Sequence, residues 1–251
     1  MSLITEQQIY DVYILQSRNV RKLSKVKDNL CREINRNLKK NNQFHVEVKT
    51  KILSLLYSAW SEAQYVQILH TPKGFFPRLI KDIETERKRH GIISGWNLMI
   101  ELAIAKVGDI NSSYDLSIRQ DKLKLIIKEN IEKQSILRNK IAHGQWVHAL
   151  NSDHTGQSPF TDDLNSLDYV AIDKLFEVHK FLGLIIRDLV QSPKKGFHQN
   201  YWSNLVSLEE YLEKSKEWTI ETRKTMLEKR PIKYKMANKA NSASAKSRAA
   251  D

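Results

Sequence analysis

Glycine and proline are scarce in this chain, and that scarcity is what most constrains its fold. The 251 residues include only 8 glycines and 5 prolines, and long segments contain neither. These two residues are the least favourable in the interior of a helix. Segments with the alternating pattern of β-strands are almost absent. The sequence therefore predicts an all-α protein, a bundle of about six helices.

Apolar residues of the first forty positions recur at three- and four-residue steps, as in Leu23, Val26, Leu30, Ile34 and Leu38. This spacing predicts one long N-terminal helix with an apolar stripe, and Lys and Arg fill much of its other face. Further helices are predicted at 48–70, 76–89, 96–107, 119–150, 170–190 and 201–229. We divide the chain into an N-terminal helix (1–45), a helical bundle (46–192), a C-terminal helical extension (193–230) and a basic disordered tail (231–251).

The chain is basic, with a formal net charge of +12. Residues 223–251 contribute nine Lys/Arg against two Asp/Glu. An excess of this size favours a polyanionic partner, either nucleic acid or an anionic membrane surface. The tail could equally be a disordered end that only keeps the chain in solution.

Several classes of protein are disfavoured. Cys31 is the only cysteine, so the chain forms no internal disulfide and no cysteine zinc cluster. The N-terminus lacks the apolar stretch of a signal peptide, and no apolar run approaches the ~20 residues of a spanning helix. We expect a cytoplasmic protein without a membrane partner. Without a Gly-rich phosphate loop, a GxSxG motif or an acidic cluster of the two-metal kind, we also expect no cofactor and no metal.

The chemistry concentrates in one hexapeptide, Arg138 to His143. With about 100° per residue on a helix, Asn139 and His143 lie about 40° apart, whereas Arg138 lies about 140° from His143. One helix therefore makes a poor site by itself. A second copy packed antiparallel would give one cleft with two arginines and two histidines, which favours a dimer.

These residue types suit cleavage of RNA. Histidine has an unperturbed pKa of roughly 6.5, so it can take the proton from a ribose 2′-hydroxyl or give one to a leaving 5′-oxygen. Arginine offers a charged fork of donors to phosphate oxygens. With a 2′-hydroxyl as nucleophile no metal is needed, and the product is a 2′,3′-cyclic phosphate. From spacing alone, however, Arg138 could lie on a solvated face and His143 could bond a neighbouring helix.

The sequence Arg138-Asn139-Lys140-Ile141-Ala142-His143 resembles the signature of the HEPN superfamily. That signature is an arginine and a histidine separated by four to six residues, of which the first, directly after the arginine, is commonly polar. The resemblance covers about residues 48–190. It implies a metal-independent endoribonuclease, active as a homodimer, with Arg138 and His143 catalytic and Asn139 supporting. It also implies a setting in phage defence or a toxin–antitoxin system, with an antitoxin or regulatory protein as partner and RNA, such as tRNA or mRNA, as substrate. The alternatives are a non-catalytic HEPN-like RNA-binding or protein-interaction module, and the helical partner in a two-protein system whose other chain carries the chemistry.

Lys140, Trp146 and His148 are the candidate substrate-binding residues. Trp146 would lie about 60° from His143 on a continuous helix and could stack a base. His148 is five residues past His143, not the four that favour a zinc pair. Glu62 and Glu101 could pair with Arg138 or orient His143, although solvated or otherwise paired carboxylates are the simpler interpretation. Trp96 is expected in the core.

Overall fold

The computed structural model describes residues 3–229, the side chain of Lys133 excepted. The all-α prediction is confirmed: these residues form helices and a single isolated β-bridge, Leu150–Gln157. The helices are α1 (Glu6–Lys39), α2 (Gln43–Leu69), α3 (Pro77–His90), α4 (Ile92–Ile104), α5 (Tyr114–Ile127), a π-helix (Lys128–Glu132), α6 (Lys133–Ala142), α7 (Phe160–Asn165), α8 (Tyr169–Gln191), α9 (Gly196–Ser215) and α10 (Ile220–Glu228). None of them is long and apolar enough to cross a bilayer.

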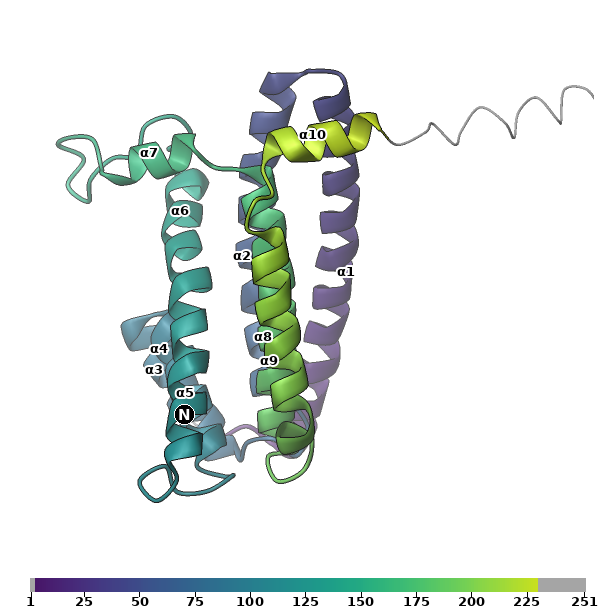
Figure 1. Ribbon diagram of the computed structural model, residues 1–251. Coiled ribbons are helices and arrows are strands. Elements are labelled where there is room, and N and C mark those ends of the chain that lie inside the picture. Colours follow the sequence, from purple (N-terminus) through teal and green to yellow (C-terminus); the bar gives the residue numbers. More distant parts are fainter. Residues whose placement is uncertain (1–2, 230–251) are drawn as a thin grey trace, which may run out of the picture.

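The long N-terminal helix is present as α1. It begins with a capping box, in which Thr5 and Gln8 satisfy each other's free backbone N–H groups. It ends before Asn41, whose positive φ of 53° turns the chain. Asn42 then caps α2 by accepting a hydrogen bond from the backbone N–H of His45. Figure 1 shows α1 and α2 as long neighbouring helices joined by this short turn.

Helices α2 and α8 form the middle of the molecule, with α1 and α9 packed against them and α6 on the side away from α1 (Figure 1). One buried apolar cluster joins α3, α4 and α5 to α8 and contains Trp96, which is fully buried as expected. A second joins α1, α2 and α8 through Ile34, Tyr57 and Phe176. The predicted division of the chain into four segments stays a prediction.

A buried polar group lies where these helices meet. The Tyr57 hydroxyl donates to the carbonyl of Asn130 at 3.0 Å and lies 3.3 Å from Nδ1 of His179. Aromatic rings surround the imidazole, namely Tyr57, Trp60 and Trp96. Burial lowers the pKa of His179 to about 3, so the imidazole is neutral.

The predicted helix 119–150 is wrong in its extent. The chain forms α5, then a π-helix, then α6, and the helix ends at Ala142. Gly144 has a φ of 79°, and its N–H bonds the carbonyl of Ile141 while that of Gln145 bonds Lys140. This is a Schellman motif, in which glycine adopts the left-handed conformation that ends a helix. Trp146 therefore lies in the loop that follows, not on the helix.

The predicted helix 201–229 is also wrong, because it is two helices. Helix α9 ends at Ser215, and the capping box at Thr219 starts α10 in a new direction. Figure 1 shows α10 lying across one end of α1 and α2. The predicted tail, 231–251, lies outside the described residues.

Candidate functional site

The hexapeptide occupies the end of α6. Leu137 and Ile141 are buried and join a small apolar cluster with Ala149 and Leu164, which anchors the helix and the following loop. His143 is the C-terminal cap of α6, and its backbone N–H bonds the carbonyl of Asn139 at 3.1 Å. The side chains of Asn139 and His143 are exposed. Both are therefore accessible to a ligand.

Arg138 faces α2 rather than solvent alone. Its Nη2 donates to Oε1 of Glu62 in an ion pair across the two helices. The arginine side chain keeps 31% exposure, and its Nε is buried without a hydrogen-bond partner. Glu62 thus fixes the guanidinium, and only the exposed part of the side chain can meet a ligand. Of the two carboxylates considered from sequence, Glu62 pairs with Arg138, and Glu101 pairs with Lys124 at 2.6 Å.

An open depression lies beside the end of α6. Its lining includes three histidines, His143, His148 and His154, together with Trp146. The Trp146 indole N–H donates to the carbonyl of Ile141 at 3.0 Å, so the half-buried ring folds back over the helix end. The depression offers imidazole groups and one face of an indole.

Two lysines hold the loop beneath this depression. Lys140 donates from Nζ to the carbonyl of Leu150. Lys51, which is buried, donates to the carbonyl of Trp146 and forms an ion pair with Glu47 at 2.8 Å. Both ammonium groups thereby satisfy loop carbonyls. The proposed role of Lys140 in substrate binding would require it to leave Leu150 or to act from that position.

The structure brings together some of the predicted residues and separates others. His143, Trp146 and His148 share the depression, whereas Arg138 lies against α2. Arg138 and His143 make no direct hydrogen bond or ion pair within residues 3–229. His154 was missed by sequence reasoning, because only the fold of the loop returns it to His143.

The described residues contain no group of three or more His, Cys, Asp or Glu side chains placed to hold a metal ion. No family model matches the chain. Neither a curated protein nor a solved structure matches it significantly.

Proposed function

We propose that the protein is a metal-independent endoribonuclease of the cytoplasm, with Arg138 and His143 as its catalytic residues. The 2′-hydroxyl of a ribose attacks the adjacent phosphorus and the 5′-oxygen of the next nucleotide leaves. The imidazole of His143 accepts the hydroxyl proton and then returns a proton to the leaving 5′-oxygen. Arginine stabilises the charge that develops on the phosphoryl oxygens. The products are a 2′,3′-cyclic phosphate and a 5′-hydroxyl.

The observation that carries the proposal is the placement of the hexapeptide at an uncovered helix end. His143 lines an open depression with two more histidines, and the guanidinium of Arg138 is fixed by Glu62 while the side chain keeps 31% exposure. Asn139 is exposed on the same helix and would orient a phosphate oxygen. Trp146 and His148 would contact the flanking nucleotides.

One chain alone places Arg138 and His143 on different sides of α6. We therefore propose a homodimer in which two α6 helices line one cleft, so that the arginine of one copy acts with the histidine of the other. RNA such as tRNA or mRNA is the substrate. A setting in phage defence or a toxin–antitoxin system follows from the HEPN resemblance, and an antitoxin or regulatory protein would restrain the enzyme.

A second candidate is a non-catalytic RNA-binding or protein-interaction module. The pairing of Arg138 with Glu62 and of Lys140 with the Leu150 carbonyl favours it, since both cations already have partners within the chain. In that case α6 would serve only for association.

The two candidates are separated by incubating total cellular RNA with the purified protein in EDTA. We expect discrete cuts with 2′,3′-cyclic phosphate ends from the wild type. Arg138→Ala and His143→Ala should each lower the rate by about 10²-fold or more. Arg89→Ala and His90→Ala, exposed residues of α3, are matched controls that should cleave normally. Intact RNA with the wild type would favour the binding module.

A further inference from the structure

The outward face of α1 carries a row of cations. Lys and Arg recur there mostly at steps of three and four residues, with one step of seven between Lys25 and Arg32, so that they stack on one side of the helix. The exposed members are Arg18, Arg21, Lys22, Lys25, Arg32, Arg36 and Lys39, followed by Lys40 at the helix cap. With about 100° per residue, all eight fall within an arc of about 100° opposite the buried Ile34. We call these eight residues the α1 stripe.

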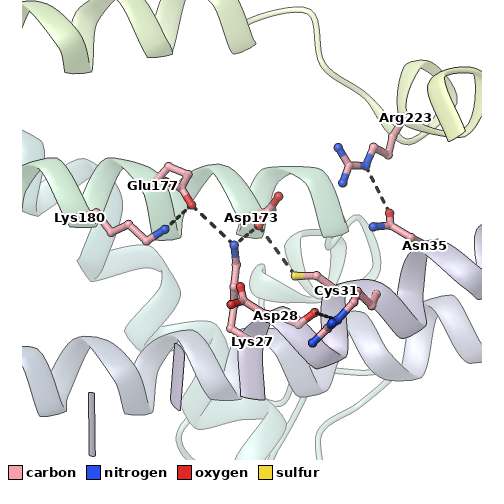
Figure 2. Close-up of polar contacts among 9 residues, drawn as sticks. Lys27, Asp28, Cys31, Asn35, Asp173, Glu177, Lys180 and Arg223 are labelled. Atoms are coloured by element: carbon pink, nitrogen blue, oxygen red, sulfur yellow. Dashed lines mark hydrogen bonds and ion pairs between the residues drawn. The ribbon is translucent and has the colours of Figure 1, made fainter. Parts of the chain in front are cut away.

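The rotation of α1 is fixed by polar contacts outside the α1 stripe (Figure 2). Lys27 points inward, where its Nζ lies 2.7 Å from Asp173 and 3.6 Å from Glu177 of α8. Near the other end, Asn35 accepts a hydrogen bond from Nε of Arg223 of α10 at 3.3 Å. These contacts hold the helix with the α1 stripe facing solvent.

The stripe is not neutralised within the described chain. None of its eight cations forms an ion pair there, whereas the inward Lys27 has two carboxylate partners. Between Arg18 and Lys40 the helix holds only two acidic residues, Asp28 and Glu33, and Glu33 is paired with Lys49. A row of like charges that repel one another at this spacing lowers the stability of the helix. Binding of an anionic polymer would relieve that repulsion.

We propose that the α1 stripe docks the phosphate backbone of RNA. From Arg18 to Lys39 the row runs about 30 Å along the helix, which suits a linear polyanion. The choice of RNA rests on the proposed function. The stripe is nevertheless a separate surface, since α1 and α6 lie on opposite sides of α2 and α8 (Figure 1).

The composition of the C-terminal segment, which lies beyond the described residues, also favours RNA as the partner. Residues 230–251 contain six Lys/Arg and one Asp. They follow α10 in the sequence, and α10 packs across one end of α1 (Figure 1). The α1 stripe and this segment carry charge of the same sign, so both suit a polyanionic partner. A membrane fits less well, because most of the apolar side of α1 packs against α2 and α8, and only single side chains such as Leu15 and Val26 stay exposed to enter lipid.

The test compares two quadruple variants of equal charge. The stripe variant lacks half of the α1 stripe and carries Arg18→Gln, Lys22→Gln, Lys25→Gln and Arg36→Gln. The α3 variant lacks the same number of exposed Lys and Arg and carries Arg78→Gln, Lys81→Gln, Lys88→Gln and Arg89→Gln. Both sets are made in the full-length chain with His143→Ala, so that the RNA stays intact, and thermal melting checks that both fold.

Binding is measured by fluorescence anisotropy with a labelled single-stranded RNA, a DNA duplex and phosphatidylserine vesicles, over a range of salt concentrations. For RNA we expect the stripe variant to bind about tenfold or more weakly at ~0.1 M salt. The slope of log affinity against log salt concentration should become shallower by about 3, because four phosphate contacts are lost. The α3 variant should bind as the parent does.

Equal RNA binding by the two quadruple variants would overturn the proposal. Tighter stripe-dependent binding of the DNA duplex or of the vesicles would also overturn it, by assigning the surface to those partners. Absence of cleavage by the wild-type chain would refute the proposed nuclease without changing this comparison. Cleavage together with equal binding would refute the stripe alone.

Discussion

Glu62 and Arg138 form the contact at which single-residue chemistry most affects the proposed site. Glu62 neutralises the cation that would bind phosphate, yet it also fixes its position. Glu62→Gln keeps an acceptor for the guanidinium and removes the charge. A partly exposed ion pair is worth about 0.2–1 kcal/mol, so we expect KM for RNA to fall about two- to fivefold. Steady-state cleavage kinetics measure this, and an unchanged or higher KM would show that Glu62 does not compete with substrate.

His179 gives the protein a specific sensitivity to acid. The unfolded chain binds a proton at this histidine below a pKa of about 6.5, whereas the buried imidazole does not until its pKa of about 3. The stabilisation is therefore present above pH 6.5 and is lost as the pH falls from there toward 3, by about 1.4 kcal/mol per pH unit.

This dependence is checked by urea unfolding between about pH 7 and 5, above the range in which most carboxylates titrate. His179→Phe should lower the pH dependence of the unfolding free energy by the equivalent of one proton, while His198→Gln, at an exposed histidine, should leave the contribution of His179 in place. Burial also lowers the pKa of His70. This histidine remains in both variants, so its contribution to the pH dependence is the same in each and does not affect the difference between them. An identical slope in His179→Phe and the wild type would contradict the account.

At the scale of elements, the π-helix sets the direction in which α6 presents its residues. The wider turn of the π-helix rotates the residues after Glu132 about the helix axis, relative to a continuous α-helix. The Tyr57 hydroxyl donates a hydrogen bond to the carbonyl of Asn130 within the π-helix. Tyr57→Phe leaves that carbonyl without its donor, which costs about 1–3 kcal/mol. Tyr65→Phe is the matched control, because the Tyr65 hydroxyl is buried with no hydrogen-bond partner. Equal unfolding free energies for the two variants, measured in urea, would refute this role.

Sequence periodicity predicted most elements because each has its own apolar stripe and end signal. It predicted α1 to within a few residues, and placed α2, α3 and α8 closely. It failed at α6, where Gly144 was available as a stop signal but the apolar pattern was extended past it to Leu150. A π-helix depends on tertiary contacts such as that of Tyr57, so periodicity does not reveal it.

For the site, too, the sequence predicted the residue types but not the placements that depend on tertiary structure. The hexapeptide and its residue types are visible in the sequence, as is Glu62 as a candidate partner of Arg138. The gathering of His148 and His154 beside His143 depends on how an irregular loop folds. The bonding of Lys140 to Leu150 depends on that loop as well.

At the scale of the whole molecule, the protein has two separate surfaces, the α6 end, proposed for cleavage, and the α1 stripe, proposed for backbone binding. A chain with only one arginine and one histidine in the hexapeptide cannot complete the proposed reaction on one side of α6. The proposed reaction therefore depends on the association of two chains, and mixed dimers test this dependence.

The most direct measurement is cleavage of RNA in EDTA by co-expressed, doubly tagged heterodimers of Arg138→Ala and His143→Ala chains. Each variant homodimer lacks one residue type altogether and should be inactive. The heterodimer retains one arginine and one histidine across the cleft, and we expect it to recover a measurable part of the wild-type rate with 2′,3′-cyclic phosphate ends. Wild-type cleavage with no recovery in the heterodimer would contradict the composite site, and no wild-type cleavage would contradict the nuclease.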